Sequence, residues 1–210
     1  RREDGVQLDA HPSHIAAYCD ASLRRLGTET IDLYYLHRVD PQVPIEESVA
    51  AMADLVTQGK VRHLGVSEVT PEELRRAHAV HPIAAVQMEW SLMWREPELS
   101  IVPAARELGV GLVPYSPLGR GLLSGRIDAA TVADSPFRAN DPRFNGGHLS
   151  ANLNQVEALT HLARSWDMTT AQVALAWLLS QGDDVVPIPG TRRADRVREN
   201  AAAMSCRLTA

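Results

Sequence analysis

Short apolar segments alternate with helical patterns along almost the whole chain, and this alternation limits the possible folds more than any other feature. Residues 31–36 (IDLYYL) are apolar and aromatic, which predicts a buried β-strand. The segments 61–66, 83–86, 110–113 and 185–188 predict strands for the same reason. Near-continuous apolar strands separated by helices are typical of a parallel sheet covered on both faces. The chain is therefore predicted to be an α/β protein.

Helical signals fill the intervals between these strands. Residues 70–73 (TPEE) form a capping-box pattern with proline at the first helical position. Helices expected over 12–26 and 97–108 are each followed by a terminating glycine. Further helices are predicted over 45–56, 153–166, 170–181 and 194–204. The segment 116–150 differs, because its Gly, Pro and Arg residues show no clear period, and loops of that length are usually functional or mobile.

Two architectures combine strands and helices in this way: the open doubly wound sheet and the (β/α)8 TIM barrel. The open sheet predicts a glycine-rich turn after its first strand, whereas Gly119–Gly125 follows a late strand with a different spacing. The barrel builds its site at the carboxyl ends of its strands. Polar residues stand there repeatedly: His37, Ser67, Glu68, Gln87 and Tyr115. We therefore predict an incomplete TIM barrel with about five of the eight strands, forming a single domain over residues 1–210.

Charge and composition exclude several classes of partner. The chain has 21 Lys and Arg against 26 Asp and Glu, a net charge of −5, whereas nucleic-acid binders usually show a basic surplus. The longest apolar stretch, residues 171–179, is about half of the ~20 residues that a membrane-spanning helix needs. Two cysteines, Cys19 and Cys206, provide no disulfide framework and suit a reducing cytoplasm. The histidine pairs lack acidic or thiol co-ligands, so no metal site is predicted.

Three groups of residues carry candidate chemistry. His37 at a strand end can donate a hydrogen bond to a substrate carbonyl, although a core or surface histidine is the simpler interpretation. The sequence YSPLGRG at 115–121 places an aromatic ring before a backbone-rich turn, which suits a flat ring joined to a phosphate. Residues 191–193 lead into a helix carrying Arg196, which predicts an anion site or, alternatively, a solvated basic face.

Taken together, these residues resemble the aldo-keto reductases, which are NADP(H)-dependent oxidoreductases built on the TIM barrel. The resemblance is carried, in the family's order, by 22–27 (SLRRLG), 31–38 (IDLYYLHR), 59–67 (GKVRHLGVS), Gln87, 115–119 (YSPLG) and 188–191 (IPGT). It implies a cytoplasmic enzyme that reduces a small aldehyde or ketone by hydride transfer from NADPH.

The resemblance also implies roles for individual residues. His37 would orient the substrate carbonyl, while Ser67 and Gln87 would hold the nicotinamide carboxamide and Tyr115 would stack on its ring. The remaining implied contacts are Ser116, Leu118 and Gly121 along the pyrophosphate, Thr191, Arg192 and Arg196 at the 2′-phosphate, and Glu199 and Asn200 near the adenine.

Two positions depart from the family pattern. Glu68 stands where asparagine is usual, and Gly190 stands where many members carry lysine, which leaves Arg192 as the expected substitute. The family's proton-donor tyrosine, with its assisting aspartate and lysine, lies before the fourth strand. These residues therefore either precede Arg1 or do not exist, and the family's final helix and C-terminal loop are missing after Ala210.

Two alternatives stay open at this point. A truncated chain could bind nucleotide or a partner without reducing a carbonyl, and a barrel enzyme could instead use its cationic site for phosphorylated substrates. The sequence does not indicate which carbonyl compound is reduced, the physiological direction, or the oligomeric state.

Overall fold

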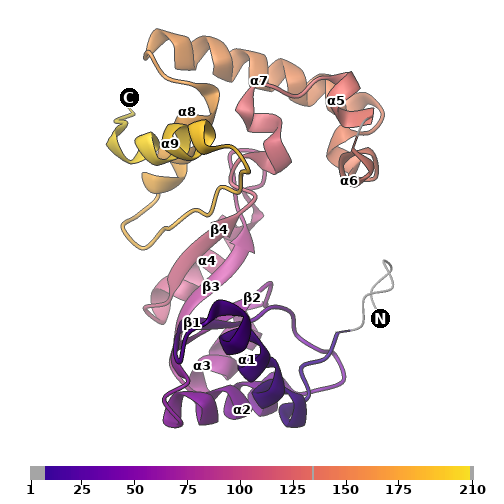
Figure 1. The fold of residues 1–210 in the computed structure, drawn as a ribbon. Helices are drawn as coiled ribbons and strands as arrows, with labels where there is room; N and C mark the ends of the chain where they lie inside the picture. Colours follow the sequence, from indigo (N-terminus) through magenta and orange to yellow (C-terminus); the bar gives the residue numbers. More distant parts are fainter. Residues whose placement is uncertain (1–7, 134, 209–210) are drawn as a thin grey trace. The chain divides into compact units, whose positions relative to one another are not determined.

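The computed structural model describes residues 8–133 and 135–208, and the chain divides into two compact units (Figure 1). The first unit comprises the residues up to Met88 together with Glu96–Val113. The second comprises Glu89–Arg95 and the residues from Pro114 onward. Because the relative placement of the units is not determined, each is described by itself.

A four-stranded sheet runs in the order β1-β2-β3-β4. Its strands are β1 (Ile31–Leu36), β2 (Val61–Ser67), β3 (Ile83–Glu89) and β4 (Gly111–Tyr115). The pairs β1–β2 and β2–β3 are parallel, with Tyr35 opposite Gly65 and Ser67 opposite Gln87. Parallel strands need crossover connections, and a helix follows each of the first three strands. The predicted α/β class is confirmed.

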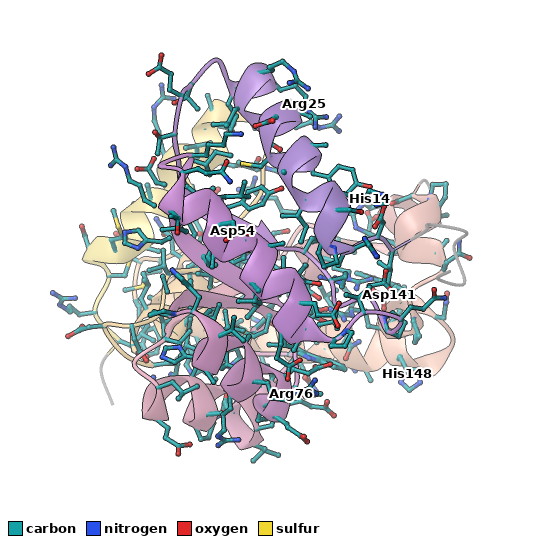
Figure 2. All side chains as sticks on the ribbon, turned by 90° about the horizontal axis from the view of Figure 1, so that it is seen from below. His14, Arg25, Asp54, Arg76, Asp141 and His148 are labelled. Carbon is teal, nitrogen blue, oxygen red and sulfur yellow. The ribbon has the colours of Figure 1, made fainter. Side chains whose placement is uncertain are left out.

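The helices of the first unit pack on one another in chain order, α1 with α2, α2 with α3 and α3 with α4. They are α1 (Pro12–Leu26), α2 (Ile45–Thr57), α3 (Pro71–Val80) and α4 (Ile101–Glu107), the last preceded by the 3₁₀ turn η1 (Glu96–Leu99). Apolar side chains such as Val49, Leu64 and Leu74 are fully buried. Charged ones such as Asp54 and Arg76 are exposed and point outward (Figure 2).

The expected helix ends are present. Helix α1 ends at Gly27, whose left-handed backbone (φ 66°) lets its N–H donate to the Leu23 carbonyl. Helix α3 begins with a complete capping box: the Glu73 N–H donates to the Thr70 hydroxyl, and the Thr70 N–H donates to the Glu73 carboxylate. Of the helices described, none has the length and apolar character needed to cross a bilayer.

The second unit is mostly helical. Its elements are η2 (Gly119–Ser124), α5 (Ala129–Ala133), α6 (Pro136–Ala139), η3 (Pro142–Phe144), α7 (Gly147–Ser165), α8 (Thr170–Leu179), α9 (Ala194–Ala202) and η4 (Ala203–Ser205). Leu122, Leu123, Phe144 and Val156 lie in its buried core. The segment 116–150 is therefore not an unstructured loop: it folds into short helical turns, too short to show a sequence period, and contains the start of α7.

The predicted strand at 185–188 is wrong. Val185 forms only a single bridge, and the Ile188 N–H donates to the Pro114 carbonyl at 3.0 Å. Pro187 and Pro189 lack the N–H groups that a continuing ladder would need. The described residues consequently form four strands rather than the expected five.

Candidate functional site

Three polar residues form a row at the carboxyl edge of the first unit's strands. Ser67 and Gln87 are paired across β2 and β3, and Leu36 is paired with Val66, so His37 follows β1 at the level of Ser67. The ladder continues one step further, where the Glu68 N–H donates to the Gln87 carbonyl at 3.0 Å. The sequence prediction that these residues share one edge is thus met by the register.

Arg38 connects two members of this row. Its Nη1 donates to the His37 carbonyl at 2.8 Å and to the Ser67 hydroxyl at 3.1 Å. Because a hydroxyl that accepts one hydrogen bond still has its own proton to donate, Ser67 keeps a donor for a ligand. Sequence analysis missed this arginine, although its place directly after His37 at the strand end was the available signal.

The second unit contains a cavity of about 510 Å³ between the loop after β4 and the start of α9. Eight residues expected to bind cofactor line it: Tyr115, Ser116, Leu118, Gly121, Thr191, Arg196, Glu199 and Asn200. Segments far apart in the sequence therefore meet around one cavity. Arg192 does not belong to this lining, because it stands before the N-cap residue Arg193 and is exposed.

One wall of the cavity is a loop with an unusual backbone. Ser116, Gly119, Arg120 and Gly121 all have positive φ, at 47°, 55°, 57° and 100°. Two hydrogen bonds between residues three apart in the sequence close the loop. The Gly119 N–H donates to the Ser116 carbonyl, and the Gly121 N–H donates to the Leu118 carbonyl. The three consecutive left-handed residues Gly119, Arg120 and Gly121 give this loop a tightly turned backbone.

Another part of the lining comes from α9. Arg196, Glu199 and Asn200 share one face of this helix because they are three and four residues apart. The Arg196 Nε is buried without a hydrogen-bond partner, which is an unmet donor at the edge of the cavity. Arg193 holds the pKa of Asp195 at about 2, so that carboxylate is already neutralised by its neighbour.

Two further arginines of the lining escaped sequence analysis. Arg126 pairs with Glu199 at 3.3 Å, and the Arg138 Nε donates to the Arg120 carbonyl at 3.2 Å. Both lie in the aperiodic segment 116–150, where the abundance of arginine was the only signal. With Arg120 and Arg196, four arginines line the cavity. Within the described ranges, no group of three or more His, Cys, Asp or Glu residues is placed to hold a metal ion.

The first unit thus combines an α/β fold with polar strand ends, and the second unit holds an arginine-lined cavity. The model of the aldo/keto reductase family matches residues 2–210. A probable aldo-keto reductase of Glycine max is 47% identical over 204 residues, which are 97% of this chain and 59% of that protein. The chain belongs to the aldo/keto reductase family.

Solved structures agree with this assignment. A glycerol dehydrogenase from Gluconobacter oxydans superimposes with a TM-score of 0.91 at 32% identity, over 100% of this chain and 64% of that one. A thermostable aldo-keto reductase bound to the inhibitor epalrestat gives a TM-score of 0.77 at 30% identity, over 95% and 64%. The predicted TIM-barrel class is thus confirmed, and the chain spans about three fifths of the length of these relatives.

Proposed function

We propose that this chain carries the cofactor site of an oxidoreductase that interconverts a small aldehyde or ketone with its alcohol, using NADP(H). The observation that carries the proposal is the cavity of the second unit, which is lined by an aromatic strand end, a loop with left-handed backbone and four arginines. This set matches a ligand that joins a flat ring to several phosphates. When bound, the cofactor supplies hydride from its nicotinamide ring.

The residues that line the cavity are assigned to different parts of the cofactor. Tyr115 offers a ring face for stacking, and the backbone from Ser116 to Gly121 faces the pyrophosphate, with Leu118 covering it. Thr191 and Arg196 receive the 2′-phosphate, where the buried Arg196 Nε gains its missing partner. Glu199 and Asn200 lie at the adenosine end. Arg192 takes at most an outer place, because it does not line the cavity.

The row at the strand ends of the first unit supplies the remaining roles. By family resemblance, Ser67 donates its hydroxyl proton to the nicotinamide carboxamide, and Gln87 exchanges hydrogen bonds with the same group. His37 donates a hydrogen bond to the substrate carbonyl oxygen and so favours the build-up of negative charge there. In the family, a tyrosine on the loop after the second strand protonates that oxygen, and none of the residues described here is assigned that role.

Binding titrations test the cofactor proposal. NADPH and NADH are titrated by nicotinamide fluorescence against the unmodified protein and Arg196→Ala. Hydrogen bonds between charged groups contribute about 1.5–3 kcal/mol, so Arg196→Ala should raise the Kd for NADPH by about 10- to 150-fold and leave that for NADH nearly unchanged. Arg192→Ala serves as the matched arginine outside the lining and should have a much smaller effect.

Each outcome separates the alternatives. Equal losses for NADPH and NADH in Arg196→Ala would remove the 2′-phosphate assignment. NADPH binding without carbonyl-dependent oxidation would favour a nucleotide-binding chain that does not catalyse. Binding of sugar phosphates in place of NADPH would favour a barrel enzyme for phosphorylated substrates.

A further inference from the structure

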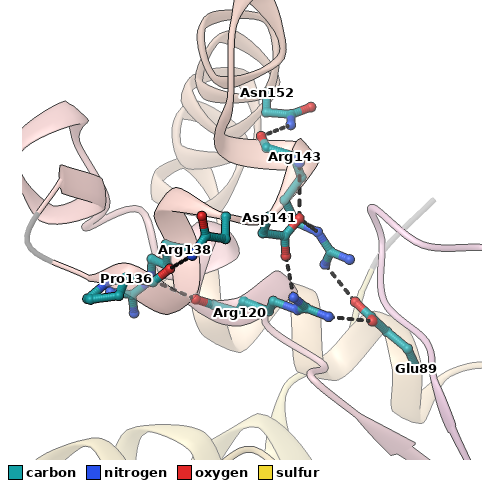
Figure 3. A network of polar contacts seen from close by, with 8 residues as sticks. Glu89, Arg120, Pro136, Arg138, Asp141, Arg143 and Asn152 are labelled. Atoms are coloured by element: carbon teal, nitrogen blue, oxygen red, sulfur yellow. Dashed lines mark hydrogen bonds and ion pairs between the residues drawn. The ribbon is translucent and has the colours of Figure 1, made fainter. Parts of the chain in front are cut away.

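A buried network of four charged residues lies beside the cavity in the second unit (Figure 3). Glu89 and Asp141 are only 8% and 6% exposed. The Arg143 guanidinium donates to Glu89 at 2.6 Å and contacts Asp141 at 3.2 Å, and the Arg120 guanidinium contacts Asp141 at 2.5 Å and Glu89 at 3.6 Å. Two carboxylates thus neutralise two guanidinium groups within one closed ring of contacts.

Arg120 is the member that shapes the cavity wall. Its backbone is left-handed, at φ 57°, between Gly119 and Gly121, which also have positive φ. Such a conformation is strained for a non-glycine residue, so glycine would be the least strained choice. The residue found there is Arg120, and two buried carboxylates hold its side chain. These contacts offset the strain of its backbone.

The same network holds the segment from α6 to η3 against this loop. The Asp141 carboxylate accepts the Arg143 backbone N–H at 3.0 Å, and the Asn152 side chain donates to the Arg143 carbonyl at 2.8 Å. Arg138, on the same segment, donates to the Arg120 carbonyl. Its Nη2 lies so close to Gly121 that an added Cβ there would be 3.3 Å away.

The network and the cavity therefore share Arg120 alone. Arg120, Gly121 and Arg138 line the cavity, whereas Glu89, Asp141 and Arg143 do not. We propose that Glu89, Asp141 and Arg143 are positioning residues, which act through Arg120 to fix the left-handed loop and Arg138 in the arrangement that receives the pyrophosphate. This inference rests on the proposed function and adds residues that have no contact with the ligand.

Because two carboxylates balance two guanidinium groups, the network adds no net charge beside the cavity. It can act on the cavity only by holding the loop in its conformation. Removing the Asp141 carboxylate leaves the Arg120 and Arg143 guanidinium groups to share Glu89 alone, and Arg120 then loses the shorter of the two contacts that offset its backbone strain. The loop wall should relax, while the α9 wall, which the network does not touch, should keep its shape. Binding of the pyrophosphate should therefore weaken, while binding of the 2′-phosphate end should not change.

Two ligands distinguish these ends. NADPH spans the whole cavity, whereas adenosine 2′-monophosphate carries only the adenosine and 2′-phosphate groups. In Asp141→Asn, which keeps the shape of the side chain, we expect the Kd of NADPH to rise by about tenfold or more and that of adenosine 2′-monophosphate to change by less than about twofold. The matched control is Glu46→Gln, which breaks the pair of Arg76 with Glu46 in the first unit and should leave both Kd values unchanged.

Other results would overturn the inference. An equal loss for both ligands would mean that the network only stabilises the fold, and no loss for either would mean that the loop holds itself. Should Asp141→Asn fail to fold, Glu89→Gln tests the same prediction from the other carboxylate, which also lies outside the lining. If the unmodified protein binds neither ligand, the proposed function itself fails, and that outcome is distinct from failure of the network.

Discussion

The aromatic ring of Tyr35 on β1 lies directly against the backbone of Gly65, its partner on β2. A Cβ built on Gly65 would be 2.5 Å from Tyr35 Cε1, far inside contact distance. Gly65 does not have positive φ, so its need for glycine comes from this close approach and not from backbone freedom. A glycine inside a strand often marks such an approach.

This close contact predicts whether a substitution at Gly65 stabilises or destabilises the protein. Without the ring, alanine in place of a strand glycine would stabilise by about 0.5–1 kcal/mol. With the ring in place, Gly65→Ala overpacks the sheet and should lower the free energy of unfolding by about 1–3 kcal/mol. Urea denaturation measures this change. Gly147→Ala is the matched control, because nothing lies within 4 Å of its added Cβ, and it should not destabilise.

A double-mutant cycle tests the cause. If the ring is the obstacle, Gly65→Ala should cost much less in a Tyr35→Ala background, and the two effects should not add. Additive effects would place the cost elsewhere in the sheet.

A second prediction concerns the end of α7. Asp167 has φ 55°, and the Met168 N–H donates to the Ala163 carbonyl while the Asp167 N–H donates to that of Arg164. This is a Schellman motif with a non-glycine residue at the left-handed position, and the carboxylate also meets the negative end of the helix dipole. Asp167→Gly should therefore stabilise by about 0.5–1 kcal/mol in thermal unfolding. Asp167→Asn should give part of this gain, and a loss in both variants would contradict the assignment.

The sequence could predict the α/β class because each element carries a local signal: apolar runs for the strands, a capping box at Thr70, and Gly27 after α1. It failed at 185–188, where apolar residues resemble a strand but Pro187 and Pro189 prevent a ladder. The need for glycine at position 65 could not be predicted either, because the ring that requires it comes from another strand.

The candidate site shows the same division. Arg196, Glu199 and Asn200 were expected from the family resemblance, and their helical spacing places them on one face of α9. Arg192 was expected beside them as the substitute for the family's lysine, yet the chain turns into α9 only after it. The network around Asp141 depends on contacts over long sequence separations, such as Glu89 with Arg143. For this reason no local sequence pattern predicts it.

A third prediction uses the acid titration of Asp9. A hydrogen bond from Tyr18, then one from His14, lowers the pKa of this carboxyl from 3.8 to about 2. Because the folded-state pKa is lowered, the stabilisation is present above about pH 4 and is lost as the pH falls towards 2. Tyr18→Phe should raise the pKa of Asp9 towards 3.8, by more than His14→Ala does. Carboxyl NMR titration measures both.

Asp195 is the internal control for this titration. Its pKa, also about 2, is lowered chiefly by Arg193. It should keep that value in Tyr18→Phe, and a shift of both groups would indicate a general change of the fold.

The last prediction concerns His37, measured on the intact protein. The proposed function assigns the imidazole a hydrogen bond to the substrate carbonyl, so His37→Ala should remove a hydrogen bond that strengthens as charge develops on that oxygen. Losing one such donor typically lowers kcat by about 10²- to 10³-fold, whereas the Kd of NADPH should change by less than about twofold, since His37 is assigned to the substrate. Stopped-flow oxidation of NADPH by an aldehyde separates the two quantities. His63→Ala, at an exposed histidine of β2, should change neither, and an unchanged kcat in His37→Ala would mean that another group polarises the carbonyl.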